Sequence, residues 1–272
     1  MQTIFHEGSS FLHRLNPLSK FLVGLLLFTF MLMTTDPWTP LVFAGLTLLM
    51  LRWLGQISFG QLLGILWPIL AIALVFVLIY PFFVRHNLVA DTPLLIQIGP
   101  ISIFQGGIEY GITTGLRVLA LLVISLPFSL TTDSADLIRA LVQQWRLPYR
   151  IGYSTLAAFR FVPMLQTEIS VIGAAHRVRG VNGTRGLRGA YERVRRYAVP
   201  LLATAIRQAE RAALAMDGRA FGAFPERTYY RRKQFKLSDW LFIVGALVVS
   251  TLAVICLRWL GLLGPLTFLQ IL

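Results

Sequence analysis

Long apolar runs are the feature that most constrains how this chain can fold. A helix that spans a bilayer needs roughly 20 apolar residues, and somewhat fewer where interfacial anchors flank it. Of the 272 residues, 56% are hydrophobic and only 14% are charged. We therefore predict an all-α integral membrane protein with about five transmembrane helices. The candidate runs are Phe21–Thr34, Leu41–Leu54, Ile65–Val84, Ile112–Leu130 and Leu241–Leu260.

Three further features qualify this picture. Between the third and fourth runs, the β-prone pieces Leu94–Ile98 and Pro100–Phe104 predict a small hairpin outside the membrane. Arg117 lies inside the fourth run, where a charge is costly unless it snorkels or pairs, so a functional role and simple snorkelling both remain open. The closing "GLLGPLTFLQIL" is apolar but interrupted by glycine and proline, and it is expected at the membrane interface.

Positive charge is concentrated in one part of the chain. The formal net charge is +13, and residues 139–236 hold 19 Lys or Arg against 5 Asp or Glu. Such a block can indicate nucleic acid, anionic lipid or the cytosolic side of a membrane protein, and the high hydrophobicity favours the last two. By the positive-inside rule we expect a multi-pass protein of the cell membrane whose N-terminus and basic block face the cytosol.

The chain is thus predicted to have three parts. Residues 1–131 form an N-terminal transmembrane bundle of four spans, 132–236 a cytosolic coupling-helix module, and 237–272 a C-terminal transmembrane segment. In the module, "STLAAFRFVPMLQTEISVIGAAHRVRG" and "AYERVRRYAVPLLATAIRQAERAALAMDGRAF" each predict a long amphipathic helix. Each helix ends in an arginine beside small residues, Arg179 in the first and Arg219 in the second.

Three interpretations of these two arginines follow from the residues alone. Cations stabilise a helix C-terminus, and Gly180 is suited to a C-cap. Alternatively, the basic block binds anionic headgroups. In the third interpretation, the two helix ends enter acidic grooves of a cytosolic partner, for which bidentate arginine is well suited.

Enzymatic and metal chemistry find little support in the sequence. The lysines lack the preceding glycine of a P-loop, and "GYSTL" lacks the second glycine of a nucleophile elbow. A single cysteine and four scattered histidines give no metal-ligand spacing. No enzyme activity, cofactor or metal is expected.

The chain resembles a known family along nearly its whole length, the transmembrane T component of energy-coupling factor (ECF) transporters. The likeness begins at "SSFLHRLNPLSKF" and continues through "TTDSADLIRAL" and "LPYRIGYSTLAAFRFVPMLQTE". It extends through "AAHRVRG" and "PLLATAIRQAERAALAMDGRAFGAFPERT". Each piece is a weak signal alone, whereas their order and spacing make the match specific.

The resemblance implies where partners bind. The family has an Ala-Arg-Gly-type triplet at the end of each of two coupling helices. Here the first is Val178-Arg179-Gly180, preceded by Arg177, and the second is Gly218-Arg219-Ala220, preceded by Asp217. Both arginines match the pattern, whereas Gly218 and Ala220 depart from it and leave the second helix ending uncertain.

In such a transporter the chain would be a non-catalytic scaffold in the lipid bilayer. It would hold a membrane-embedded substrate-binding S component and seat two ABC-type ATPase subunits. ATP-driven closure would then move the coupling helices, and the S component would release a vitamin or metal cofactor inside. The sequence does not indicate which substrate is carried.

Two rivals from other classes stay open at this stage. A self-sufficient secondary transporter would need a polar site at the membrane midplane, and the spans hold few ionisable residues. A membrane-tethered nucleic-acid-binding protein would need base-stacking aromatics, which are nearly absent among the arginines of residues 176–219. No nucleic acid partner is therefore expected.

Overall fold

The computed structural model describes residues 10–83, 92–98, 101–180, 187–224, 228–230 and 232–263. The chain divides into two compact units, one of Met1–Leu137 with Gln234–Leu272 and the other of Ile138–Lys233. Most of the sequence expected at the C-terminal interface, and most of "PERT" at 225–228, lies outside the described residues.

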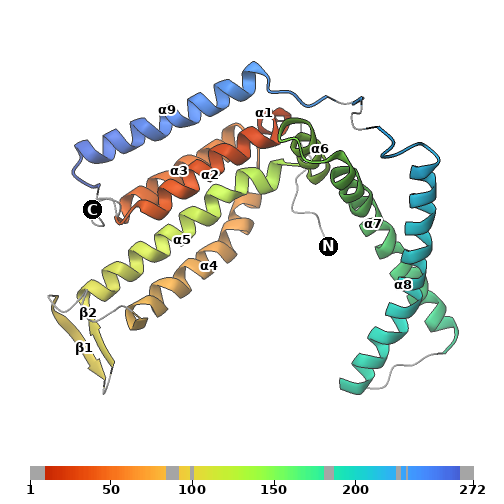
Figure 1. The fold of residues 1–272 in the computed structure, drawn as a ribbon. Coiled ribbons are helices and arrows are strands. Elements are labelled where there is room, and N and C mark those ends of the chain that lie inside the picture. Colours follow the sequence, from red (N-terminus) through yellow and green to blue (C-terminus); the bar gives the residue numbers. More distant parts are fainter. Residues whose placement is uncertain are drawn as a thin grey trace. The chain divides into compact units, whose positions relative to one another are not determined.

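The first unit is a helical bundle with one hairpin (Figure 1). Its helices are α1 (Phe11–Arg14), α2 (Pro17–Met33), α3 (Trp38–Trp53), α4 (Phe59–Phe83), α5 (Gln105–Thr131) and α9 (Leu237–Trp259). Strand β1 (Leu94–Ile98) pairs antiparallel with β2 (Ile101–Phe104), as the β-prone pieces predicted. Helix α6 (Ser134–Gln144) leads into the second unit, which contains α7 (Tyr149–Val178) and α8 (Leu187–Asp217).

Hydropathy explains which helices suit a bilayer. Helices α4, α5 and α9 are each long and apolar enough to cross a membrane, whereas α2 and α3 are shorter apolar helices of 17 and 16 residues. The outer face of α4 exposes large apolar side chains, such as Leu74 at 57% and Leu78 at 61%. Lipid rather than water suits such a surface. The predicted helical membrane fold is confirmed.

Helix α5 packs against α2, α3 and α4 and supplies much of the core. Its contact with α4 is close because Gly107, Gly111 and Gly115 recur every four residues on one face. A Cβ added at Gly111 would lie 2.9 Å from the Val77 carbonyl oxygen, and one at Gly115 would lie 2.9 Å from that of Ala73. Such small residues allow two helix backbones to approach each other in a membrane.

Arg117 donates to a helix end. From α5, its guanidinium donates a hydrogen bond to the carbonyl of Thr34, the residue that caps the C-terminus of α2. The last carbonyls of a helix lack partners within the helix and carry partial negative charge. The charge that the sequence left open is thus paired with the backbone.

Two buried polar contacts tie distant parts of this unit together. Lys20 is 4% exposed, and its ammonium donates to the Thr131 carbonyl at 2.9 Å and to the Thr131 Oγ1 at 3.0 Å. Asp239, at the start of α9, is 1% exposed and accepts from the Asn16 backbone N–H at 2.7 Å. The Asn16 side chain in turn caps α2 by accepting from the Leu18 N–H at 3.0 Å, with Pro17 at the first helical position.

Candidate partner-binding site

The first arginine end is formed where α7 stops. Arg177 and Val178 complete the helix, Arg179 is the C-cap residue, and Gly180 follows with φ +64°. The Arg179 N–H donates to the Ala175 carbonyl at 3.1 Å, and the Gly180 N–H donates to the Arg177 carbonyl at 3.1 Å. Glycine suits this position because a left-handed conformation costs it no Cβ clash.

The second arginine end follows α8 in a similar way. The helix ends at Asp217, and Gly218 and Arg219 continue the turn to Ala220, which has φ +52°. The Ala220 N–H donates to the Asp217 carbonyl at 2.9 Å, and the Phe221 N–H donates to the Met216 carbonyl at 3.0 Å. This pair of bonds is a Schellman motif, in which Ala220 occupies the position usually held by glycine.

The two helix endings share one feature despite their different sequences. Each places an arginine immediately before a residue in the left-handed region, Gly180 in one case and Ala220 in the other. The departure of Gly218-Arg219-Ala220 from the family triplet does not prevent an equivalent turn. Every residue of both triplets, with Arg177 and Asp217, is exposed, and Val178 reaches 90%.

Neither arginine is neutralised within the part of the chain that the structure describes. No ion pair or side-chain hydrogen bond involves the guanidinium of Arg179 or Arg219 among those residues. An arginine in solvent keeps its planar fork of donors available for a carboxylate on another molecule. The geometry thus presents two charged tips rather than two internal contacts.

Helices α7 and α8 run antiparallel, so the two tips lie at opposite ends of the pair (Figure 1). The two helices contact each other near Gly173, where an added Cβ would lie 3.1 Å from the Tyr197 hydroxyl oxygen. The ring centroids of His176 and Tyr197 are 5.4 Å apart. With 30 residues, α7 is about 45 Å long at 1.5 Å per residue. Arg179 and Arg219 are separated by a distance of that order.

The segment after α8 is held against the start of α7. Arg150 donates from its Nη2 to the Gly222 carbonyl at 2.6 Å, and the Tyr149 hydroxyl donates to the Phe224 carbonyl at 2.7 Å. The ring of Phe221 lies edge-on to that of Tyr149, with centroids 5.7 Å apart. These contacts fix the turn that carries Arg219.

Sequence reasoning did not find Tyr149, Arg150 or Phe221 as parts of the site. The partners are 72 to 75 residues apart along the chain, and no local pattern marks a contact at such a separation. The close packing of α5 against α4 was also missed. The sequence could have predicted it, because the four-residue spacing of glycines in α5 is a known signal for close helix packing.

The described residues contain no group of three or more His, Cys, Asp or Glu side chains placed to hold a metal ion. The site is instead a pair of exposed cationic tips on two antiparallel helices. Such an arrangement can bind acidic surfaces through charge-assisted hydrogen bonds.

Together, the apolar helices and the two arginine-tipped helices define a helical membrane protein with a basic helical pair. Comparison with known sequences then identifies the family. The chain belongs to the CbiQ family, described as cobalt transport protein, whose model matches residues 8–230.

Curated relatives extend over nearly the full chain. The energy-coupling factor transporter transmembrane protein EcfT of Bacillus subtilis is 28% identical over 255 residues, which cover 90% of this chain and 93% of that protein. The EcfT of Brevibacillus brevis is 30% identical over 261 residues, covering 93% and 94%. The EcfT of Streptococcus thermophilus is 30% identical over 254 residues, covering 89% and 93%. The resemblance inferred from the sequence is confirmed.

Proposed function

We propose that this chain is the non-catalytic scaffold of an ECF-type ABC importer and transmits ATP-driven motion to a substrate-binding S component. The observation that carries the proposal is the pair of equivalent arginine ends, each with a left-handed residue directly after the arginine. Two similar tips suit two similar sockets. The names of the relatives, which are transmembrane proteins of energy-coupling factor transporters, support the same assignment.

Each tip would enter an acidic groove on one ABC-type ATPase. The binding residues are Arg177, Val178, Arg179 and Gly180 at the first end, and Asp217, Gly218, Arg219 and Ala220 at the second. A separation on the order of 45 Å is far too large for both arginines to share one groove. It supports a pair of ATPase subunits, whose relative movement would be passed to α7 and α8.

A membrane-embedded S component would use a different surface. Helices α7 and α8 expose apolar side chains that water does not favour, including Val199 and Leu202, both 63% exposed, and Leu214 at 71%. Exposed apolar patches mark interaction surfaces for proteins or lipid. An S component beside the scaffold would cover part of this surface and follow the helices when they move.

The distribution of charge supports one orientation and division of the chain. The excess of 19 basic over 5 acidic residues in 139–236 supports an orientation in which the module 132–236 and the N-terminus face the cytosol, on the side of the proposed ATPases. Residues 1–131 and 237–272 then form the membrane part. The hydrolysis of ATP is assigned to the partners, because this sequence has no P-loop of its own.

Co-purification and transport assays test the proposal. The tagged chain, purified from native membranes, should retain two ATPase subunits and an S component, and that complex should hydrolyse ATP. The isolated chain in liposomes should neither hydrolyse ATP nor take up substrate. Uptake driven by an ion gradient through the chain alone would instead establish a secondary transporter and overturn the scaffold assignment.

A further inference from the structure

The turn between α2 and α3 brings three polar side chains together beside α5. From α5, the Arg117 guanidinium donates to the Thr34 carbonyl, and Asp36 follows Thr34 by two residues. The Asp36 Oδ2 accepts from the Thr39 N–H at 2.7 Å, in the first turn of α3. The Asp36 carboxylate also lies within electrostatic range of the guanidinium. Arg117, Asp36 and Thr39 therefore lie close together inside the first unit.

Each of these three side chains has one buried atom that lacks a hydrogen-bond partner among the described residues. The atoms are the Arg117 Nε, the Asp36 Oδ1 and the Thr39 Oγ1. Asp36 is 5% exposed and Thr39 is 0% exposed, so both are shielded from bulk solvent. Buried polar groups without a partner destabilise a protein and are uncommon in native structures. Three of them in one place indicate a bound group that satisfies them together.

The chemistry of the three atoms selects this group. The Arg117 Nε–H only donates, a carboxylate oxygen such as the Asp36 Oδ1 only accepts, and the Thr39 hydroxyl can do either. A water molecule complements the set, because it can accept from Arg117, donate to Asp36 and form its third bond with Thr39. Buried waters make about three such bonds to polar groups that would otherwise be unsatisfied. A cation would be repelled by Arg117, and an anion would be repelled by Asp36.

We propose that one ordered water molecule bridges Arg117 and Asp36 and bonds the Thr39 hydroxyl. The bridge completes an ion pair in the membrane part of the chain, where an uncompensated charge is costly. It also joins α5 to the turn between α2 and α3. This role is independent of ATPase docking, since all three residues belong to the first unit.

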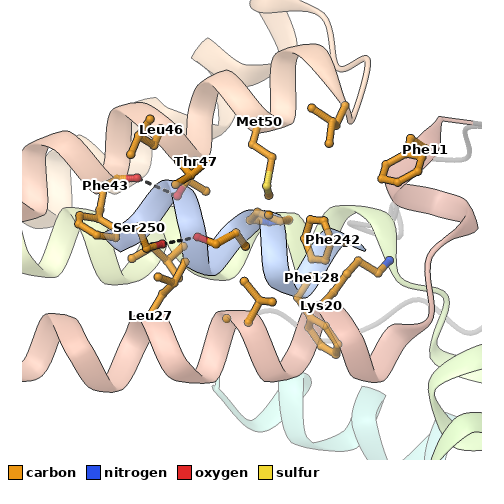
Figure 2. A pocket seen from close by; sticks show the side chains of 18 of the residues that line it. Phe11, Lys20, Leu27, Phe43, Leu46, Thr47, Met50, Phe128, Phe242 and Ser250 are labelled. Carbon is orange, nitrogen blue, oxygen red and sulfur yellow. Dashed lines mark hydrogen bonds between the residues drawn. The ribbon is translucent and has the colours of Figure 1, made fainter. Parts of the chain in front are cut away.

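Thr47, further along α3, provides a matched control for the Thr39 hydroxyl. Thr47 is 7% exposed and lines a cavity of about 390 Å³ among α2, α3, α5 and α9. Figure 2 shows its Oγ1 donating to the Phe43 carbonyl of the same helix, at 2.8 Å. The two threonines thus share a helix and are both buried. They differ in that the Thr47 hydroxyl is satisfied within its own helix.

The sign of a stability change tests the bridge. Thr39→Val removes the hydroxyl and nearly preserves the shape of the side chain. With the water bound, the thermal midpoint of the detergent-solubilised full chain should fall by about 2 to 4 °C, as expected for one lost hydrogen bond. Thr47→Val should leave the midpoint nearly unchanged, because its hydroxyl bonds only within the helix. An unchanged or raised midpoint for Thr39→Val would overturn the proposal, since the loss of an unpartnered buried hydroxyl costs nothing.

A density map of the full chain, at a resolution that shows ordered water, tests the site directly. A single peak should lie within about 3.2 Å of the Arg117 Nε, the Asp36 Oδ1 and the Thr39 Oγ1. The same peak should weaken or vanish in a map of Thr39→Val and persist in a map of Thr47→Val. Direct contact between the Arg117 Nε and the Asp36 Oδ1 with no peak between them, or another side chain in place of the peak, would show that no water bridge forms.

Discussion

The backbone N–H of Asn16 donates a hydrogen bond of 2.7 Å to the carboxylate of Asp239, which is 223 residues further along the chain. The same carboxylate accepts from the Lys236 N–H at 2.8 Å and from the Ser19 hydroxyl at 3.5 Å. Several donors thus compensate the burial of one charge. The contact joins the entrance of α2 to the start of α9 and closes the first unit.

Replacing Asp239 should therefore destabilise the membrane part. Asp239→Ala leaves the Asn16 N–H buried without its acceptor, so we expect a loss on the order of 3 kcal/mol in the free energy of unfolding. The thermal midpoint of the detergent-solubilised protein measures this loss. Asp133→Ala is the control, because Asp133 is exposed and its carboxylate accepts a 3.4 Å bond from the Ala135 N–H. Equal midpoints for the two variants would show that the buried carboxylate contributes little.

Backbone conformation predicts opposite effects at the two arginine ends. Gly180→Ala forces alanine into the left-handed region and should lower stability by about 1 kcal/mol, since its Cβ meets nothing else within 4 Å. Ala220→Gly removes the same strain and should raise stability by a smaller amount, because glycine also adds entropy to the unfolded chain. Thermal midpoints of the two variants should shift in opposite directions. Shifts of the same sign would show that the two turns are not equivalent.

Arg150 is expected to act on partner binding by positioning the turn that carries Arg219. Arg150→Ala removes the 2.6 Å bond to the Gly222 carbonyl and should weaken ATPase binding by several-fold, about 1 kcal/mol. In an Arg219→Ala background the same change should have little further effect, because coupled residues are not additive. Arg160→Ala removes the same charge from an exposed position of α7 and serves as the control. Full additivity of Arg150→Ala with Arg219→Ala would contradict the positioning role.

The glycine contact between α4 and α5 predicts that the effect of a larger side chain on stability depends strongly on which glycine is replaced. A Cβ at Gly115 would approach the Ala73 carbonyl oxygen to 2.9 Å and also meet Val77, so Gly115→Leu must push the helices apart. We expect a loss of at least 1 to 3 kcal/mol, roughly the cost of overpacking a core. A Cβ added at Gly64 meets no atom within 4 Å, so Gly64→Leu should be tolerated. The yield of monodisperse protein in detergent separates the two outcomes.

Hydropathy predicted that the apolar helices exist, but it did not predict the residues at which they begin. The first apolar run was predicted to begin at Phe21, whereas its helix, α2, begins at Pro17. The fourth run was predicted to begin at Ile112, whereas α5 begins at Gln105. The first turn of α2, Pro17–Lys20, is buried inside the protein. At the start of α5 only Gly106 and Gly107 are buried, whereas the polar Gln105 and Glu109 are exposed. Lys20 is buried by its bonds to Thr131, so a charge that ends an apolar run does not end the helix.

The candidate site was accessible to sequence reasoning only in part. The arginines were found because they recur beside small residues at the ends of two long helical patterns, and the structure places both where a helix stops. The conformation of Ala220 could not be predicted, because alanine rarely takes a left-handed backbone. Its turn is fixed by contacts with Arg150 and Tyr149 through the segment that follows. Whether the tips bind ATPases stays a prediction.

Charge reversal distinguishes a socket from an ordinary helix cap. If Arg179 and Arg219 only favour helix ends, Arg→Lys retains most of the benefit, and Arg→Glu costs about 1 kcal/mol without removing a partner. If each enters a desolvated acidic groove, Arg→Glu brings like charges together and should cost about 2 to 5 kcal/mol of binding. Arg→Lys should then also weaken binding, because an ammonium cannot reproduce the bidentate contact.

The double variant Arg179→Glu/Arg219→Glu should therefore lose both ATPases while it remains folded in the membrane. Co-purification of the ATPases and substrate uptake measure the loss, and Arg160→Glu, an exposed reversal within α7 away from both tips, should retain both. Reversing one acidic residue in the ATPase groove to arginine or lysine should restore binding to the glutamate tip, since the charge pair is re-formed with opposite polarity. If each arginine acted only as a helix cap, a change in the ATPase groove could not restore binding, because a helix cap makes no contact with the ATPase. Full assembly of the double variant would show that both arginines act only within their own helices.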